Sequence, residues 1–165
     1  MTYHQQVYNV AYGVVNNADD AKELAQQTWV KAWTKLGSFK EDAGFFTWVY
    51  RIAYNASLDF LRRKGRQREE ALPEGVEPVG DARFERAPSE TTRPDRELER
   101  AEIQALFDDS LRELSPEHRL ALTLREVDGL SYEEIAKVMR CRKGTVMSRI
   151  FYARQKIQEK MRGLL

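Results

Sequence analysis

The sequence predicts an all-α protein in which a flexible acidic linker joins two small helical domains. In residues 1–65 and 96–165, apolar side chains recur at steps of three and four, which is the period of an amphipathic helix. Residues 66–95 between them hold four of the five prolines and an excess of acids. Because this stretch has too few apolar residues to bury a core, it is predicted to be a linker.

The composition excludes several classes of protein. The chain has 165 residues and a net charge of +1, so any affinity for nucleic acid must come from local clusters of charge. A single cysteine, Cys141, excludes an intrachain disulfide and disfavours a structural zinc site. No apolar run reaches the roughly 20 residues of a membrane span, and the amino end lacks the pattern of a signal peptide. We therefore expect a cytoplasmic protein with no membrane insertion.

The first two helices are predicted from their apolar stripes. Residues 16–17 end the first helix, and residues 19–20 place acidic charge at the start of the second, which continues to Gly37. Trp29 and Trp33 of the second helix are expected in the core, because side chains of this size bury a large apolar area. The stripes are Val7, Val10, Ala11, Val14 and Val15 in the first helix, and Ala21, Leu24, Ala25, Thr28, Trp29, Ala32, Trp33 and Leu36 in the second.

A third helix is predicted from Phe45 to Gly65, with two different faces. One face is apolar and suits a core, and the other alternates polar groups with aromatic rings before a basic end at residues 62–64. Rings that stack, cations that hold a backbone and an amide that bonds a base edge suit unstacked nucleotides. An ordinary amphipathic helix with a solvated face explains most of these residues equally well. The polar face holds Thr47, Arg51, Asn55, Asp59 and Arg62, and Trp48, Tyr50 and Tyr54 border it.

The carboxy-terminal domain is predicted to have four helices. The first covers residues 96–114, and Ser115 caps a second that starts at Pro116. Ser131 and Glu134 form a capping-box pattern, residues 140–144 form a turn, and Thr145 begins a last helix. The final two elements make a helix-turn-helix. In residues 96–114 the expected buried set is Leu98, Ala101, Ile103, Ala105, Leu106 and Leu111.

Residues 137–162 carry nine Lys or Arg residues against one acid, Glu159. Such a helix suits the major groove of DNA, where its start reaches base edges and flanking cations meet phosphates. The alternative is a small helical hairpin with a solvated basic face.

The sequence gives no sign of an enzyme. His4, His118 and Cys141 form neither a nucleophile-base pair nor a metal-ligand spacing, so no cofactor or catalytic residue is predicted.

Both halves resemble the extracytoplasmic-function (ECF) sigma factors of bacterial RNA polymerase. Residues 46–55 with 59 and 61–63 are similar to the promoter-melting helix of that family. Residues 114–119, 124–126, 129–136 and 144–149 are similar to its carboxy-terminal DNA-reading domain. The resemblance implies a non-catalytic protein that binds core RNA polymerase and promoter DNA. It also implies an anti-sigma factor as a partner, and no small-molecule substrate.

The resemblance also implies binding roles for particular residues. The minus-ten element would be captured, with the loop at residues 39–44, by Phe46, Trp48, Arg51, Asn55, Arg62 and Arg63. The minus-thirty-five element would be read by Tyr132, Arg142, Lys143, Thr145, Met147, Ser148, Arg149, Phe151 and Tyr152. The clamp coiled coil of the largest polymerase subunit would be bound by Asp20, Leu24, Gln26, Gln27 and Val30.

The sequence departs from the family pattern at three places. Gln27 stands where an acid is usual, and Met147 and Tyr152 stand where some relatives have arginine. The amino end is short by about one helix, which implies either a trimmed start or completion of the first domain by a partner. A rival interpretation, a repressor or a response-regulator output domain, explains residues 131–160 but gives residues 45–64 no role.

Overall fold

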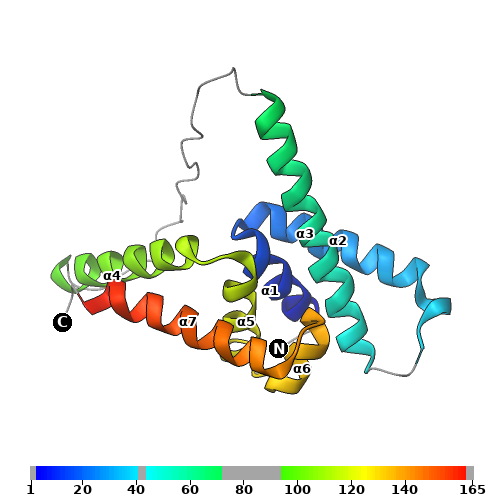
Figure 1. Cartoon of the computed structure of the whole chain (residues 1–165). Helices are drawn as coiled ribbons and strands as arrows, with labels where there is room; N and C mark the ends of the chain where they lie inside the picture. Colours follow the sequence, from blue (N-terminus) through cyan, green and yellow to red (C-terminus); the bar gives the residue numbers. More distant parts are fainter. Residues whose placement is uncertain (1–2, 41–43, 72–93, 163–165) are drawn as a thin grey trace.

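The computed structural model describes residues 3–40, 44–71 and 94–162, without the side chains of residues 69–71 and 94–100. The described residues form seven α-helices and one short 3₁₀ turn, η1 (Leu36–Ser38), and contain no strand, which confirms the predicted all-α class (Figure 1). The helices are α1 (Tyr3–Val15), α2 (Ala18–Thr34), α3 (Phe45–Ala71), α4 (Pro94–Glu113), α5 (Pro116–Glu126), α6 (Tyr132–Met139) and α7 (Lys143–Met161).

Short polar side chains cap the starts of α2, α5 and α6, and the sequence predicts two of these caps, at Ser115 and Ser131. The Asn17 side chain accepts bonds from two backbone N–H groups at the start of α2. Ser115 caps α5, and Ser131 begins α6 with a complete capping box in which Glu134 bonds back to the cap. Arg140 ends α6 in the left-handed conformation, with φ at 50°. Local sequence is therefore sufficient to define these boundaries.

Four predicted boundaries are wrong. The second helix was expected to continue to Gly37, but α2 ends at Thr34 and Leu36–Ser38 form η1. Gly65 does not end the third helix, since α3 continues to Ala71. Gly65 is exposed, has no positive φ, and is followed by residues with high helix propensity, so nothing stops the helix there. At the other end of the expected linker, α4 already begins at Pro94, and α7 begins at Lys143 instead of Thr145. The remaining linker residues, 72–93, lie outside the described residues, and the division into two domains stays a prediction.

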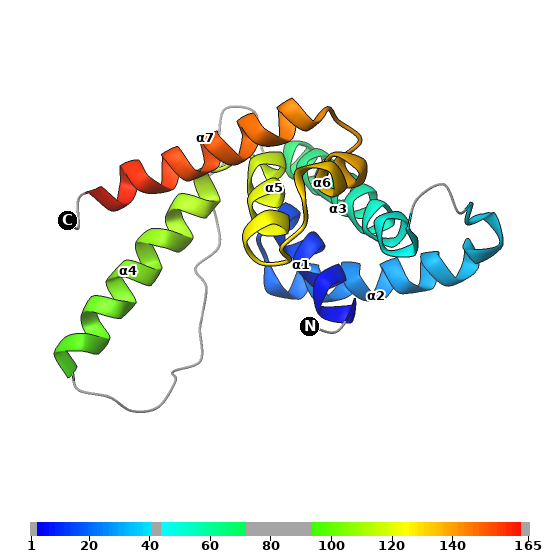
Figure 2. The ribbon, with the colours of Figure 1, turned by 90° about the horizontal axis from the view of Figure 1, so that it is seen from below.

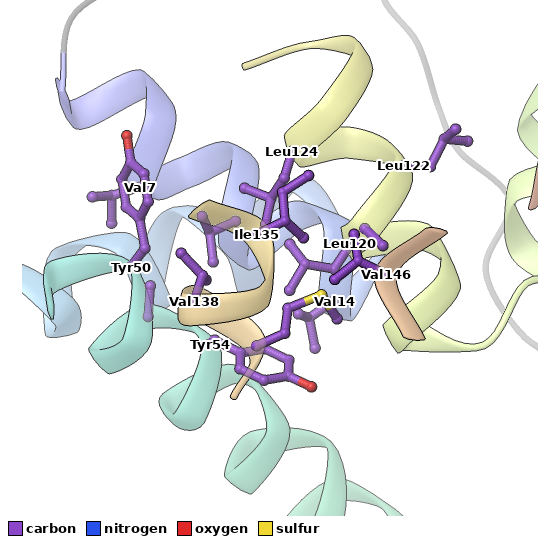
Figure 3. Close-up of a cluster of buried hydrophobic side chains, with 14 of the residues drawn as sticks. Val7, Val14, Tyr50, Tyr54, Leu120, Leu122, Leu124, Ile135, Val138 and Val146 are labelled. Atoms are coloured by element: carbon purple, nitrogen blue, oxygen red, sulfur yellow. The ribbon is translucent and has the colours of Figure 1, made fainter. Parts of the chain in front are cut away.

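The two halves of the chain share one hydrophobic core. A single cluster of buried side chains contains residues from α1, α2 and α3 together with residues from α5, α6 and α7. Figure 3 shows Ile135 and Val138 of α6 in the same cluster as Val14 of the first half and Leu124 of the second. Figure 2 shows α5 beside α1 and α6 beside α3, while α4 and α7 extend away from the shared core. The carboxy-terminal helices are thus packed directly on the amino-terminal ones.

The crossing of α1 and α5 is unusually close because Gly13 lies at the contact. A Cβ atom at this position would lie 3.2 Å from Leu120 Cδ1 and 3.3 Å from Thr123 Oγ1. Those distances are shorter than an ordinary van der Waals contact, so a side chain at this position would require its neighbours in α5 to shift. The sequence thus favours close contact between the halves at this point.

Polar contacts across the two halves accompany this crossing. The buried guanidinium of Arg119 in α5 donates to the carbonyls of Gly13 and Val14 in α1, both at 2.9 Å, and to Leu111 in α4 at 3.0 Å. Since a buried charge is costly unless it is hydrogen-bonded, these acceptors are essential to the arrangement. Further along α1, Asn9 donates to the Asp128 carboxylate at 2.8 Å.

Several expected core residues are exposed instead. Trp33 is 79% exposed and Ile103 is 43% exposed, whereas Trp29 is partly buried. Ala101 and Ala105 are exposed too, so much of the described surface of α4 faces solvent. The stripe at Ala21, Leu24, Ala25, Thr28 and Ala32 fills the α2 contact and is buried as predicted. Trp33 lies off that stripe, which explains its exposure.

We predict that Ser131→Ala destabilises the protein by about 1 kcal/mol, because it removes the hydroxyl that accepts a bond from the Glu134 backbone N–H at 3.2 Å. Urea unfolding followed by circular dichroism measures the change. Ser148→Ala is the control, since that exposed hydroxyl bonds only one carbonyl within α7 and should alter stability by less than about 0.5 kcal/mol. Equal losses in the two variants would contradict the role of the capping box.

We also predict a pH effect at Asp128. Burial raises the pKa of its carboxyl, although the bond from Asn9 opposes the shift, and its Oδ2 atom is buried without a partner. A folded-state pKa above the unfolded value of about 4 stabilises the fold at low pH, and this contribution is lost as the pH rises through the raised value. Asp128→Asn should therefore be more stable than the wild type at pH 7 and lose less stability between pH 4 and 7. Urea unfolding at several pH values measures the two free energies of unfolding. If those of Asp128→Asn and the wild type changed with pH in parallel, the prediction would be refuted.

Candidate nucleic-acid interface

The outer side of α3 carries a stripe of four expected minus-ten residues: Trp48, Arg51, Asn55 and Arg62. Steps of three, four and seven keep them on one side of the helix. Asn55 and Arg62 are exposed, and Arg62 pairs with Asp59 at 3.3 Å. An amide and a guanidinium thus stand free of the core on the side predicted to meet nucleotides. We call these four residues the α3 stripe.

Aromatic rings cluster at the start of α3. The Trp48 ring lies 5.2 Å from that of Phe39 and 5.8 Å from that of Phe45, so it is held against the segment that precedes the helix. Phe46 lies on the opposite side and stacks on Tyr3 of α1, with ring centroids 3.8 Å apart. The structure therefore does not bring Phe46 to the side of Asn55. Residues 41–43 of the expected minus-ten loop lie outside the described residues.

Two tyrosines that were expected to border the polar side of α3 are buried. Tyr50 is 4% exposed and Tyr54 is 8% exposed. Burial raises the pKa of Tyr50 to about 12, with Asp128 adding to the shift, and burial also raises the pKa of Tyr54, with Glu117 adding to it. The acidic neighbours belong to the carboxy-terminal half, so that half is what covers these rings.

The α3 stripe also contacts the helix-turn-helix directly. Arg51 Nε donates to the backbone carbonyl of Lys137 in α6 at 2.8 Å. The end of α6 thus lies against the middle of the stripe, whereas Asn55, one turn further along, stays exposed. Sequence patterns give no sign of this contact, because the two residues are 86 positions apart.

Arg63 lies outside the stripe, in a depression of about 440 Å³ between α2 and α3. Lys64, beside it, pairs with Asp20 at 2.9 Å. The depression therefore joins one expected minus-ten residue to the expected polymerase-binding residues Asp20 and Gln27. It is lined by Asp20, Glu23, Gln27, Phe60, Arg63, Lys64 and Gln67.

The expected polymerase-binding residues of α2 divide between core and surface. Leu24 is 1% exposed and packs inside the protein, so its side chain cannot meet a partner. Gln26 is exposed and Val30 is 64% exposed. With Trp33, which our sequence analysis placed in the core, Val30 forms an apolar surface on α2 at a three-residue step. In the sequence, Val30 stands outside the predicted apolar stripe, whereas Trp33 was placed on it and lies at its edge in the structure.

One side of α7 is buried in the core, and the opposite side is exposed to solvent. Val146, Ile150 and Ala153 point into the core, and the opposite side exposes Met147, Ser148 and Phe151, the last at 70%. Large apolar side chains on a surface are notable when they gather on one helix face, because such patches mark interaction sites. The exposed side of α7 is therefore suited to contact a partner surface.

Ion pairs occupy only part of the basic charge around α7. Lys143 pairs with Glu133, Arg154 with Glu126, and Lys160 with Glu113. By contrast, the exposed Arg140 and Arg142 have no ion pair among the described residues. Both precede α7 in the turn, so free positive charge is concentrated at the start of this helix.

The remaining candidates lie at the edges of the helix-turn-helix. Thr145 is half-buried, and Arg149 donates to the Cys141 sulfur at 3.8 Å. The Tyr152 ring contacts that of His118 with centroids 4.8 Å apart, and burial with nearby Arg149 lowers the pKa of His118. The Arg125 guanidinium covers the Tyr132 ring at 4.9 Å.

Comparison with known proteins decides the family. Residues 1–67 match the model of Sigma-70 region 2, and residues 104–157 match the model of Sigma-70, region 4. The chain belongs to the ECF group of RNA polymerase sigma factors. It is 38% identical over 168 residues to the RNA polymerase sigma-H factor of Pseudomonas aeruginosa, covering all of this chain and 85% of that relative. It is also 38% identical over 148 residues to the ECF RNA polymerase sigma-E factor of Escherichia coli K12, covering 88% and 76%.

Two solved structures of sigma factors resemble this ECF sigma factor. RpoE from Bartonella quintana, in complex with the anti-sigma factor NepR, superposes with a TM-score of 0.74 at 26% identity, over 97% of this chain and 92% of that one. CnrH, in complex with the cytosolic domain of CnrY, has a TM-score of 0.59 at 22% identity, over 98% and 81%, which shows the shared fold.

Membership of this family implies a non-catalytic regulator that directs promoter-specific transcription. Region 2 contains the α3 stripe and region 4 contains the helix-turn-helix, as the sequence patterns indicated. Among residues 3–40, 44–71 and 94–162, no cluster of metal-ligating side chains occurs. In the same ranges, no helix is long and apolar enough to cross a membrane.

Proposed function

We propose that the α3 stripe of this sigma factor captures the non-template strand of the melted minus-ten element. The supporting observation is the exposure of Asn55 between Arg51 and Arg62, with the Trp48 ring one turn before Arg51. Flipping a base out of the duplex costs a few kcal/mol, which stacking on a ring and bonding to an amide can offset. Phe46, which stacks on Tyr3, supports this surface from behind, and Arg63 adds charge at its far end.

We propose that α7 reads the minus-thirty-five element. Met147, Ser148 and Phe151 form its exposed side and would face base edges, including the methyl groups of thymines. Arg142, at the start of the helix, would meet a phosphate, because it is exposed and carries no ion pair among the described residues. Lys143 would first have to leave Glu133.

The proposed partners follow from the family and from the surface of α2. Val30 and Trp33, with Gln26 beside them, offer an apolar surface for the clamp coiled coil of core polymerase. An anti-sigma factor is a further proposed partner, because a relative that aligns along almost the whole chain is bound by one. Since core polymerase and promoter DNA are the targets, we propose that the protein works in the cytoplasm.

A duplex-binding regulator without affinity for polymerase is the rival proposal. It would use α6 and α7 in the same way but would leave the α3 stripe and the exposed Trp33 without a role. The match of residues 1–67 to Sigma-70 region 2 argues against it. Run-off transcription with purified core polymerase on a promoter library tests the proposed function. A chain that bound DNA but never core polymerase would favour the rival.

We predict that Asn55→Ala weakens promoter opening by about 1–3 kcal/mol, because one amide contact to a base edge is lost. Binding to core polymerase should stay unchanged, since Asn55 lies on α3 and not on the exposed surface of α2. Permanganate footprinting measures opening, and a pull-down measures binding. The control is Gln67→Ala, which removes an exposed amide from the same helix outside the stripe. Loss of opening in both variants, or loss of polymerase binding by Asn55→Ala, would contradict the assignment.

We predict that Arg142→Ala lowers the affinity for a duplex minus-thirty-five fragment and reduces the salt slope of binding by about one, because one phosphate contact is lost. Fluorescence anisotropy at several salt concentrations measures both quantities. Arg154→Ala is the matched control, since its guanidinium is already paired with Glu126 and should affect the slope less. An unchanged slope in Arg142→Ala would show that this cation does not meet phosphate.

A further inference from the structure

The exposed side of α7 is apolar over the first half of the helix, although the helix as a whole is basic. Met147, Phe151 and Tyr152 are between 45% and 70% exposed. Steps of four and five residues keep them together, on the side opposite Val146 and Ile150, which fill the core. We call Met147, Phe151 and Tyr152 the α7 apolar strip.

The strip carries no charge of its own, and the cations nearest to it along α7 have partners among the described residues. Arg149 is the only charged residue of the segment 147–152; it is half-buried and donates to the Cys141 sulfur. Lys143 and Arg154 are paired with carboxylates. A guanidinium that could form two hydrogen bonds with the edge of a guanine is therefore not part of this surface.

Free positive charge lies beside the strip, at the start of the helix. Arg140 and Arg142 are exposed and have no ion pair among the described residues. An apolar strip beside such cations fits the major groove, where base edges lie between two rows of phosphates. This charge favours DNA over an apolar protein surface as the partner of the strip.

We propose that the α7 apolar strip recognises the C5-methyl groups of thymines, so that methyl contacts set the preferred bases of the minus-thirty-five element. The proposal rests on the proposed function of α7 and names the group that this helix recognises. The thymine methyl is the apolar group that base pairs present in the major groove. Over a guanine or adenine edge, the same side chains would cover hydrogen-bond acceptors without replacing their bonds to water, which is unfavourable.

Modified bases test the proposal in the complex of core polymerase with the full chain. Run-off transcription on a promoter library first supplies the preferred upstream element, and competition binding then compares altered versions of that duplex. Deoxyuridine in place of thymidine removes only the methyl group. 5-Methyldeoxycytidine in place of thymidine keeps the methyl group but changes the hydrogen-bonding edge, and deoxycytidine changes both.

We expect deoxyuridine at each contacted thymine to lower the affinity about fourfold, because one methyl group no longer leaves water, and 5-methyldeoxycytidine to bind better than deoxycytidine by a similar factor. Met147→Ala and Phe151→Ala should each abolish the difference between thymine and uracil at the base that the side chain contacts. Both side chains are exposed, so their removal leaves the core intact. Ile103→Ala is the matched control, since it removes an exposed apolar side chain from α4 and should keep the full difference.

Equal affinity for the thymine and uracil duplexes would overturn the proposal and leave α7 as the reader of the element. So would a selected element without thymine, or a loss on uracil substitution that is the same in the wild type and in both alanine variants. If the complex selects no upstream element, the proposed function of α7 fails, and this proposal fails with it. Both also fail if a chain with Met147→Ala and Phe151→Ala together keeps the wild-type sequence preference and affinity, which would make the strip a surface for a protein partner.

Discussion

The buried guanidinium of Arg119 is the constraint on which the arrangement of the molecule depends. An arginine stays charged inside a protein, so its burial is tolerated only where acceptors surround it. Here α1 provides two carbonyls and α4 a third, which ties the first helix of region 2 to two helices of region 4. Gly13 makes the geometry possible by letting α5 approach closely enough for those bonds to form.

This constraint places the two DNA-binding regions of the sigma factor in conflict. With α1 fixed to α5, α6 packs over α3, covers Tyr50 and Tyr54, and takes up Arg51. The buried sides of α2 and α7 belong to the shared core, whereas their exposed sides point away from it. The packing therefore covers the middle of the α3 stripe at Arg51 and leaves Val30 and Trp33 of α2 uncovered.

The sequence predicts the helix caps and the amphipathic helices, because both depend on residues that are close together in the chain. The predicted caps at Ser115 and Ser131 are found in the structure, since a cap needs only residues two or three positions away. Both DNA-binding helices are also found from the sequence, because their patterns lie within single elements. The assignments that remain predictions are the contacts of individual residues with DNA and polymerase.

Long-range packing explains what the sequence does not predict. Tyr50 and Tyr54 have the spacing of a bordering stripe, but both are buried in the core that α3 shares with helices of both halves. Trp33 has the composition of a core residue but lies off the face of α2 that packs. In each case the packing of another helix decides burial: α1 and α3 pack on α2, and the contact of Arg51 with a residue 86 positions later shows how distant in the chain the partner of α3 is.

The polar contact between α1 and α5 favours two arrangements of these helices, packed or fully separated, over intermediate separations. A small separation of α1 and α5 would break the bonds of Arg119 before water could enter, leaving a buried charge without acceptors. A full separation would instead expose the unpartnered Oδ2 of Asp128 to water, which favours the separated state. A separation of α1 from α5 therefore has to carry the Arg119 guanidinium all the way to water, so this buried arginine holds the two halves in their packed arrangement.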